Sequence, residues 1–541
     1  MKIKKQDEDE MSLFFAQGKR SAESEDRVKL AELIRQAGLR LRDGGEVKVP
    51  ESIEIGGIAY DSRRVRPGDL FVAVRGEKDD GHRFIPAAAE KGAAAVLGED
   101  DFTGALPVPY LRVENSRAAL AALAAAFWQE PSRDLILIGV TGTSGKTTTT
   151  YLIESILRDA GLIPGLIGTV EYRFAGIRRA APRTTPESWD LQGLFAEMKK
   201  AGARSVVMEV SSHALVLDRV KGCVFNGAVF TNLTPEHLDF HRDLEDYFAA
   251  KRKLFVAEPG ERKFPGFFAV VNLDDAFGER LAADLRKEGT RVLGFSAQGK
   301  PGAEIRPRDL AEGWDGIRAA VETPAGLIRI DSKLLGRFNL ENILGAVGAG
   351  VGLALSPETI TRGVAEVRAV PGRLERVEPP GAGLLDFQVL VDYAHKPDAL
   401  EKVMAVLSRV KSGGRLITVF GCGGDRDKSK RSVMGRIAAG LADLLIVTSD
   451  NPRSEDPLAI IAAIRAGVEE TGRKREGQNF WIEPDREKAI RLAVGKARKG
   501  DLVLVAGKGH ETEQIIGKER LPFDDRAVAA RILTERLAPC A

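Results

Sequence analysis

Apolar runs and amphipathic segments alternate along most of the chain. Short runs of consecutive apolar residues bounded by polar turns are typical of buried strands, whereas apolar residues three and four positions apart are typical of helices. The clearest pair is a strand over 135–140 followed by a helix over 147–160, which has one apolar face and which Gly161 is expected to end. Strands that alternate with helices in this way predict an α/β fold with mostly parallel sheets.

Changes in this pattern divide the chain into four segments. Residues 1–27 are charged and poorly patterned and predict a flexible extension, whereas residues 28–133 mix short strands with Ala-rich helices, as expected of a smaller N-terminal α/β domain. Residues 134–368 form a larger central segment, which ends where the helical pattern stops before Pro371. Residues 369–541 form the last segment. The expected architecture is therefore three α/β domains preceded by an extension.

The last segment repeats one arrangement, in which an apolar strand runs into a polar loop. The four strands are expected at 389–391, 416–420, 444–447 and 502–505. In open parallel α/β sheets, ligands bind just beyond the carboxyl ends of the strands. The four loops therefore predict a ligand-binding face.

Composition restricts the class of protein. At 541 residues the chain is long enough for about three domains. Its 80 basic and 78 acidic side chains nearly cancel, which leaves no basic excess for binding nucleic acid. The longest apolar run, 118–128, is shorter than the ~20 residues that span a bilayer. Because the N-terminus lacks an apolar signal-like run and only three cysteines occur, we expect a cytoplasmic protein without membrane insertion, disulfide scaffold or cysteine metal site.

The strongest chemical signal is a Gly/Ser/Thr turn between the first strand and helix of the central segment. A strand that feeds such a turn into a helix lets backbone N–H groups surround phosphate oxygens. Lys146 is placed to reach the β- and γ-phosphates of ATP, and Thr147 to hold Mg²⁺. The general pattern has glycine where Val140 stands, so this loop is a variant, and a turn that binds no nucleotide is the alternative. The residues expected to contact ATP are Thr141, Gly142, Thr143, Ser144, Gly145, Lys146, Thr147 and Thr148.

Two further polar clusters follow expected strands of the central segment. Glu209 ends an apolar strand, where a carboxylate near a phosphate-binding loop suits Mg²⁺, although a carboxylate paired with neighbouring hydroxyls is the alternative. His237 and His241 are four residues apart and could share a helix face, as zinc ligands do. The His-Glu-x-x-His pattern of zinc proteases is absent, so a site of that kind is not expected.

Taken together, these motifs resemble those of the Mur ligase family. Besides the phosphate-binding loop they are Glu-Val-Ser-Ser-His at 209–213, Asn-Leu-Thr-Pro-Glu-His-Leu-Asp at 232–239, Gly-Arg-Phe-Asn at 336–339, Pro-Gly-Arg-Leu-Glu at 371–375 and Asp-Tyr-Ala-His at 392–395. The match runs from about residue 28 to the end, and the motifs are jointly very specific. The resemblance implies an N-terminal domain for a uridine nucleotide, a central P-loop ATPase and a C-terminal Rossmann-like domain that binds an amino acid.

The loops at 450–453 and 507–511 narrow the resemblance. Their sequences, Asp-Asn-Pro-Arg and Gly-Lys-Gly-His-Glu, resemble those of members that act on UDP-N-acetylmuramoyl-L-alanyl-D-glutamate. The resemblance implies a monomeric, ATP-dependent ligase of peptidoglycan biosynthesis, which joins an amino acid to the D-glutamate through an acyl phosphate. A P-loop kinase or GTPase is one alternative, although the guanine-reading Asn-Lys-x-Asp sequence is absent. A ligase-like scaffold that binds nucleotide without turnover is another.

The resemblance also assigns residues to each ligand. Those implied in catalysis are Lys146, His237 and Lys251, the last as a CO₂-derived carbamate, although by residue type alone Lys251 is a solvated lysine. Those implied at Mg²⁺ are Thr147, Glu209, His237 and Lys251. Those implied around the base and ribose of ATP are Asn339, Arg373 and Asp392. Those implied at the UDP substrate are Ser62, Thr184, Thr185, Ser211 and Arg219, whereas Leu217 departs from relatives that carry a substrate-contacting glutamine. Those implied at the amino acid are Arg426, Asp450, Asn451, Pro452, Arg453, Gly507 and Glu511.

Arg453 bears on which amino acid is added. meso-Diaminopimelate differs from lysine by a second carboxylate at the far end of its side chain, and a guanidinium can bind a carboxylate through two parallel hydrogen bonds. Because diaminopimelate-adding members resemble this chain at the arginine, we expect meso-diaminopimelate, with L-lysine as the alternative. The residues around Pro452 could also be a simple turn, with Asp456 capping the helix that Pro457 begins.

Overall fold

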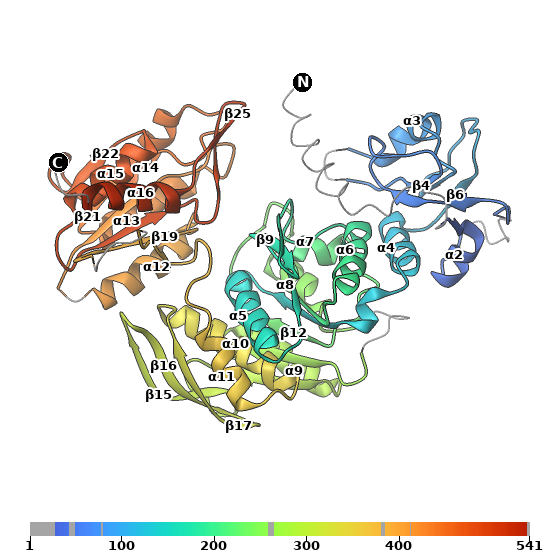
Figure 1. Ribbon diagram of the computed structural model, residues 1–541. Helices are drawn as coiled ribbons and strands as arrows, with labels where there is room; N and C mark the ends of the chain where they lie inside the picture. The colour runs from blue at the N-terminus through green and yellow to red at the C-terminus, as the bar shows by residue number, and fades with distance from the viewer. Residues whose placement is uncertain are drawn as a thin grey trace. The chain divides into compact units, whose positions relative to one another are not determined.

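The computed structural model (Figure 1) describes residues 27–42, 49–76, 79–257, 264–379, 385–411 and 413–537. The predicted extension, residues 1–27, lies outside the described residues except for Arg27. Contacts within the chain define two compact units, and each is described by itself. Unit 1 comprises residues 1–306, 323–325 and 344–360, and unit 2 comprises residues 307–322, 326–343 and 361–541.

A small parallel sheet forms the first part of unit 1. Its strands pair in the order β3 (Gly57–Ala59), β4 (Asp69–Val72), β5 (Ala95–Gly98) and β6 (Tyr110–Arg112). The elements around it are β1 (Val28–Lys29), α2 (Leu30–Gln36), β2 (Glu54–Ile55), η1 (Gly81–Phe84), α3 (Ile85–Glu90), α4 (Ser116–Phe127) and η2 (Pro131–Asp134). Leu120 and Leu123 of α4 share one core with Leu70 and Leu97 of the strands. The mixture of short strands and an Ala-rich helix is confirmed.

An eight-stranded sheet forms the larger part of unit 1. Its strand order is β10 (Ile177–Ala180), β9 (Glu171–Phe174), β8 (Pro164–Ile167), β11 (Ser205–Glu209), β7 (Ile136–Thr141), β12 (Gly227–Phe230), β13 (Phe268–Asn272) and β14 (Arg291–Phe295). Six neighbouring strands, β8, β11, β7, β12, β13 and β14, are parallel. At the edge of the sheet β9 pairs antiparallel with β8, and β10 pairs antiparallel with β9. The predicted mostly parallel sheet is therefore confirmed, and the predicted first strand is β7.

Helices connect these strands. They are α5 (Lys146–Asp159), α6 (Ser188–Lys200), α7 (Ser212–Val216), α8 (Leu244–Arg252) and α9 (Ala276–Lys287). Two further helices, α10 (Arg337–Gly352) and α11 (Pro357–Ala365), lie later in the chain and include residues of both units. Helix α5 is the helix predicted over 147–160, and its apolar residues Leu152 and Ile156 are buried where it packs against β8 and β11. Gly161 follows it with φ +74°, the left-handed conformation that ends a helix at low cost for glycine.

Unit 2 contains the Rossmann-like sheet. Its strand order is β18 (Glu375–Arg376), β19 (Gln388–Asp392), β23 (Leu502–Ala506), β20 (Leu416–Phe420), β21 (Leu444–Val447) and β22 (Phe480–Ile482), with only β18 antiparallel to its neighbour. Its helices are α12 (Pro397–Val410), α13 (Lys430–Leu441), α14 (Pro457–Glu469), α15 (Arg486–Lys496) and α16 (Asp525–Leu537). Successive strand residues enter opposite cores, since Leu390 and Leu504 lie in one cluster and Val391 and Val505 in another. Burial on both faces explains the unbroken apolar runs of the sequence.

Two smaller sheets complete unit 2. One has the order β15 (Arg306–Gly313), β16 (Gly316–Thr323) and β17 (Gly326–Ser332), and the other is the hairpin β24 (Glu513–Ile516) and β25 (Glu519–Pro522). Within the described residues, no helix is both long and apolar enough to cross a bilayer.

Candidate functional site

The turn between β7 and α5 has the conformation that a phosphate-binding loop requires. Gly142 has φ +147°, and a Cβ on it would lie 1.9 Å from Thr231 Oγ1; Gly145, at φ +88°, caps α5. The loop is fixed from the next strand, because Asn232 Oδ1 accepts from the Ser144 N–H at 2.9 Å. Val140, the departure from the general pattern, lies inside β7 before the turn begins. The departure therefore leaves the glycine turn itself unchanged.

Two lysines meet at one backbone oxygen of this loop. Lys146 Nζ and Lys251 Nζ each donate to the Gly142 carbonyl oxygen at 2.9 Å. Lys251 lies on α8, is 1% exposed, and has its Nζ 4.4 Å from the ring centroid of Tyr247. Burial, and then the neighbouring Lys146 ammonium, hold the pKa of Lys251 well below its ordinary value. Lys251 is thus a buried amine at the phosphate-binding loop, and its interpretation as a solvated lysine is wrong.

Glu209 ends β11 beside the start of α5 and is buried. Thr147 Oγ1 donates to Glu209 Oε1 at 3.0 Å, and Thr169 donates to both carboxylate oxygens, from its N–H at 2.8 Å and its hydroxyl at 3.0 Å. Gly168 has to be glycine here, because a Cβ on it would lie 2.6 Å from Glu209 Oε1. The clustered carboxylate and hydroxyl oxygens fit a hard cation such as Mg²⁺. Thr169 was not predicted, although its place after β8 is where a ligand-side residue is expected.

The segment between β12 and α8 is a turn, which corrects the helix-face interpretation of His237 and His241. His237 has φ +56°, and the N–H of His241 donates to its carbonyl oxygen at 2.8 Å. His241 is buried with Nε2 2.9 Å from Ser212 Oγ, whereas His237 is partly exposed with Nε2 3.1 Å from Glu236 Oε1. Burial, with the ammonium groups of Lys146 and Lys251, lowers the pKa of His237. A neutral imidazole beside the loop is the form that can bind a metal.

The residues predicted to hold the muramoyl peptide meet at the carboxyl end of β11. Thr185 Oγ1 donates to the Glu209 carbonyl oxygen at 2.9 Å and accepts from the Ser211 N–H at 3.2 Å. Arg219 Nη1 donates to the Thr185 carbonyl oxygen at 3.3 Å, and Thr184 Oγ1 lies 3.1 Å from Thr169 Oγ1. These contacts tie the predicted substrate segment to the backbone of Glu209 and, through Thr169, to the carboxylate beside the phosphate-binding loop.

Ser62 lies after β3, in the small sheet of unit 1. The Lys91 ammonium donates to the Ser62 carbonyl oxygen at 2.9 Å. A pocket lies between the residues next to Ser62 and the predicted substrate segment. The residues that line it include Tyr60, Asp61, Arg63, Arg64, Arg183, Glu187 and Asp190. Leu217 follows α7 directly and places an apolar, partly buried side chain near this segment. The three arginines of the lining each pair with one of its three carboxylates, so the pocket is lined by opposite charges.

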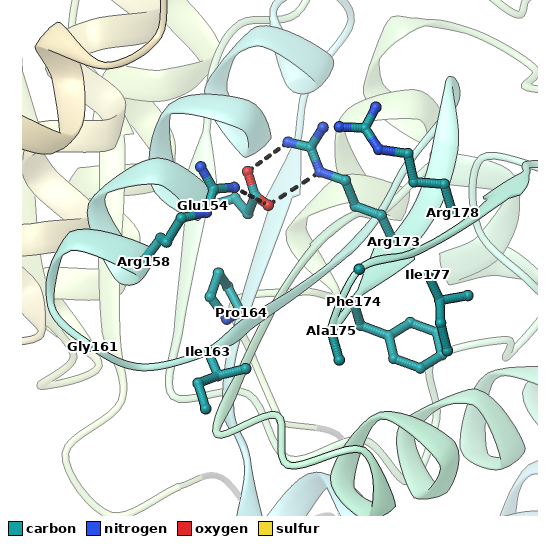
Figure 2. A pocket seen from close by; sticks show the side chains of 11 residues that line it. Glu154, Arg158, Gly161, Ile163, Pro164, Arg173, Phe174, Ala175, Ile177 and Arg178 are labelled. Atoms are coloured by element: carbon teal, nitrogen blue, oxygen red, sulfur yellow. Dashed lines mark hydrogen bonds and ion pairs between the residues drawn. The ribbon is translucent and has the colours of Figure 1, made fainter.

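A second hollow lies away from all of these residues. Figure 2 shows it between α5 and the hairpin β9–β10, where Arg158 and Arg173 both pair with Glu154. Phe174 and Ile177 give it an apolar side. None of the predicted site residues lines this hollow, so the candidate site rests on the loops and not on this hollow.

Three residues predicted near the base and ribose of ATP belong to unit 2. Asp392 ends β19, and its two oxygens accept from the N–H groups of Leu374 and Ala394 at 2.7 and 2.8 Å. Burial raises the pKa of Asp392. The Arg373 guanidinium lies 4.8 Å from the centroid of the Tyr393 ring. Asn339 is buried at the start of α10, and its Nδ2 donates to the Leu335 carbonyl oxygen at 2.8 Å. Their role at the nucleotide stays a prediction.

The residues predicted to bind the amino acid lie beyond neighbouring strands of the unit 2 sheet. They are Arg426 after β20, Asp450, Asn451, Pro452 and Arg453 after β21, and Gly507 and Glu511 after β23. Asn451 Nδ2 donates to Glu511 Oε2 at 2.8 Å, and Arg453 Nη1 donates to the Gly424 carbonyl oxygen at 2.8 Å. Gly507 lies so close to Asp450 that a Cβ on it would be 2.5 Å from Oδ2. Asp456 caps α14, as predicted, by accepting from the Leu458 N–H at 3.0 Å.

A glycine turn into α5, with a lysine, a threonine and a buried carboxylate around it, defines a P-loop nucleotide-binding enzyme. Three family models together match most of the chain. They are Mur ligase family, catalytic domain, at residues 54–128; Mur ligase middle domain at 140–350; and Mur ligase, glutamate ligase domain, at 372–509. The chain belongs to the Mur ligase family and is an ATP-dependent amide ligase. The resemblance noted in the sequence and the three-domain α/β fold are confirmed.

Individual relatives are similar over nearly their full length. A protein of Solibacter usitatus is 47% identical over 480 residues, which covers 89% of this chain and 94% of the relative. A protein of Streptomyces coelicolor is 48% identical over 504 residues, which covers 92% and 95%. Both are named UDP-N-acetylmuramoyl-L-alanyl-D-glutamate–2,6-diaminopimelate ligase.

Solved structures agree with the fold. A structure of a ligase with the same name has a TM-score of 0.65 at 31% identity, and the match covers 89% of this chain and 95% of that one. The Mycobacterium tuberculosis folylpolyglutamate synthase, at 16% identity and a TM-score of 0.57, shares the fold over 78% of this chain and 95% of its own.

Proposed function

We propose that this enzyme adds meso-diaminopimelate to the D-glutamate of UDP-N-acetylmuramoyl-L-alanyl-D-glutamate, a peptidoglycan precursor, and spends ATP to do so. The observation that carries the proposal is the cluster of Asn451, Arg453 and Glu511, which offers donors and an acceptor at the carboxyl ends of β21 and β23, the two neighbours of β20 in the sheet. The names of the relatives, at 47% and 48% identity, support the same substrates.

The first chemical step needs positive charge, because two anions have to meet. The D-glutamate carboxylate attacks the γ-phosphorus of ATP, ADP leaves, and a mixed acyl phosphate forms. Lys146, at the start of α5, neutralises charge on the transferring phosphoryl group, and the N–H groups of the glycine turn bind phosphate oxygens. Thr147 and Glu209 are the residues that would hold Mg²⁺, which supplies further positive charge at the phosphates when bound.

The second step makes the amide bond. An unprotonated amine of the amino acid attacks the acyl phosphate, a tetrahedral intermediate forms, and inorganic phosphate leaves. Asp450 Oδ2 is buried and has no hydrogen-bond partner among the described residues, so it is placed to accept from the amino group and orient it. The enzyme forms no covalent bond to substrate in this scheme, and its contribution is positioning and electrostatics.

The buried amine of Lys251 fits the proposed carbamate. A neutral amine reacts with CO₂, loses a proton and becomes an anionic carbamate, whose oxygens are of the kind that Mg²⁺ prefers. The product would be an anion facing the Lys146 ammonium at the Gly142 oxygen, and the two opposite charges would attract. His237 would complete the set of groups around the phosphates.

The remaining parts of the proposal concern the setting of the enzyme. We propose a cytoplasmic location from the use of ATP and a UDP-linked precursor, and we also propose a monomer. The predicted boundaries near residues 28, 134 and 369 are retained as domain limits. The roles of Ser62, Asn339, Arg373 and Arg426 are part of the same proposal.

ADP release tests the function directly. The purified chain is incubated with ATP, Mg²⁺ and the UDP-muramoyl dipeptide, and each amino acid is added in turn. We expect ADP release that requires the dipeptide nucleotide and that is fastest with meso-diaminopimelate. A kinase would release ADP without an amino acid, and a scaffold without turnover would release none, so either result would contradict the proposal.

A further inference from the structure

Lys508 is a buried cation next to the proposed amino-acid site. Its side chain is fully buried after β23, and its ammonium donates to Asn451 Oδ1 at 3.2 Å, to Glu511 Oε2 at 3.1 Å and to the Glu513 carbonyl oxygen at 2.5 Å. An ammonium has three donors and no acceptor. All three are used inside the protein, so Lys508 does not itself offer a hydrogen bond to a ligand.

The neighbours of Asn451 permit only one orientation of its amide group. Oδ1 faces two groups that can only donate, the Lys508 ammonium and the Ile515 N–H at 3.0 Å. Nδ2 lies 2.8 Å from Glu511 Oε2, which accepts when it is ionised. A flipped amide would point its oxygen at the carboxylate and its N–H group at the ammonium, which is unfavourable on both sides. The oxygen has no acceptor position left, so the amide of Asn451 can interact with a ligand only as a donor, through the second N–H of Nδ2.

We propose that Lys508 is a positioning residue that makes the site select a second carboxylate on the added amino acid. By fixing the amide of Asn451 it leaves N–H as the only group that this buried amide can turn to a ligand, and Arg453, two residues further on the same loop, also has only donors. A carboxylate is the group that accepts from both. The inference deepens the proposed function and rests on it, since it assigns the choice between diaminopimelate and lysine to a residue that touches neither.

Lys508→Met tests this assignment in the full-length enzyme. Methionine fills a similar volume without charge, so Asn451 Oδ1 keeps only the Ile515 N–H as a donor, and the amide is held less firmly with its N–H groups toward the ligand. We expect kcat/KM for meso-diaminopimelate to fall at least tenfold and kcat/KM for L-lysine to change less than twofold. The KM values for ATP and the UDP-muramoyl dipeptide should stay within twofold. Lys518→Met, the same substitution at an exposed position in the turn of the β24–β25 hairpin, is the matched control and should leave the ratio unchanged.

A second variant covers the case in which Lys508→Met does not fold. Asn451→Asp keeps a partner for Lys508 but replaces both N–H groups of the amide, including the one that donates to Glu511, by an oxygen, so kcat/KM for diaminopimelate should fall further than kcat/KM for L-lysine. An unchanged ratio in Asn451→Asp, or an equal fall for both amino acids in a folded Lys508→Met, would overturn the inference alone. A wild-type enzyme that shows no preference for diaminopimelate would overturn the proposed function as well, and the two failures are thereby distinguished.

Discussion

Lys146 and Lys251 both donate to the Gly142 carbonyl oxygen, but their proposed roles differ: Lys146 neutralises phosphoryl charge, and Lys251 carries a carbamate. Lys146 starts α5 and makes few apolar contacts, so Lys146→Ala should leave the fold intact but remove charge from the transferring phosphoryl group. We expect ligation to fall about 100-fold to 1,000-fold. Steady-state ADP release measures the loss, circular dichroism checks the fold, and Lys200→Ala on the exposed end of α6 is the control. Near-wild-type activity in Lys146→Ala would show that this loop does not bind ATP.

Lys251 should carry a carbamate in enzyme equilibrated with CO₂. The burial that holds its pKa well below the ordinary value favours the neutral amine, and only the neutral amine adds CO₂. With ¹³C-labelled bicarbonate, NMR of the native enzyme should show one protein-bound carbamate carbon that is absent from Lys251→Ala. Lys251→Ala should also lose most ligation. A fully active enzyme without that signal would disprove the modification.

Arg453 tests the choice of amino acid at the residue proposed to contact its second carboxylate. Arg453→Ala should lower kcat/KM for meso-diaminopimelate about 100-fold, because a charge-assisted pair with the second carboxylate is lost. L-lysine, which has no such carboxylate, should be affected far less. Competition between the two amino acids, followed by mass spectrometry of the product, measures the ratio. Undiminished use of diaminopimelate by this variant would rule out Arg453 as its carboxylate ligand.

At the scale of elements, one buried ion pair connects the helices of unit 2 to the loops of the site. Arg486, at the start of α15, pairs with Asp525 of α16 at 2.7 Å, and it also donates to the carbonyl oxygens of Ser449 and Ala506 at 3.1 and 3.0 Å. Those carbonyls immediately precede Asp450 and Gly507. The pair therefore holds two site loops as well as two helices.

Breaking this pair should be costly. Arg486→Met leaves the Asp525 carboxylate buried without its cation, so the free energy of unfolding should fall by about 3–5 kcal/mol. Arg491→Met, on the same helix but exposed, should change it by less than about 1 kcal/mol. Chemical denaturation compares the two variants. The KM for the amino acid should rise only in Arg486→Met, and equal stabilities would contradict the role of the pair.

At the scale of the whole of unit 1, a buried carboxyl joins the small sheet to the large one. The Tyr60 hydroxyl donates to Asp190 of α6, and Arg64 lies 3.8 Å away. Burial raises the pKa of Asp190 from 3.8 to about 6. The folded state therefore binds this proton more tightly than the unfolded state does. The resulting stability is fully present below pH 4 and is lost as pH rises through 6.

Asp190→Asn should remove that pH dependence. Between pH 7.5 and pH 5 the wild type should gain about 1 kcal/mol of unfolding free energy relative to the variant. The asparagine can still accept from Tyr60, so the hydrogen bond itself is retained. Denaturation of both proteins at the two pH values measures the difference, and parallel curves would mean that Asp190 does not titrate in this range.

The sequence by itself determined the elements and the glycine turn. The strands β7, β20 and β21 and the helix α5 were predicted within a residue or two, because apolar periodicity and turn residues act over a few neighbours. The turn needs positive φ at Gly142 and Gly145, and glycine adopts positive φ at low cost because it has no Cβ. The family resemblance added residue roles that local physics does not contain.

Only the tertiary structure decided which of those residues act together. Lys251 is buried against Gly142, Thr169 holds Glu209, and Lys508 fixes the amide of Asn451, and each pair is far apart in the chain. His237 lies in a turn because its segment crosses from β12 to α8 without an apolar face to support a helix. The burial of a side chain, and the pKa shifts that follow from it, depend on the residues that pack around it. Those residues come from distant parts of the chain, and they meet only when the strands pair and their carboxyl ends align.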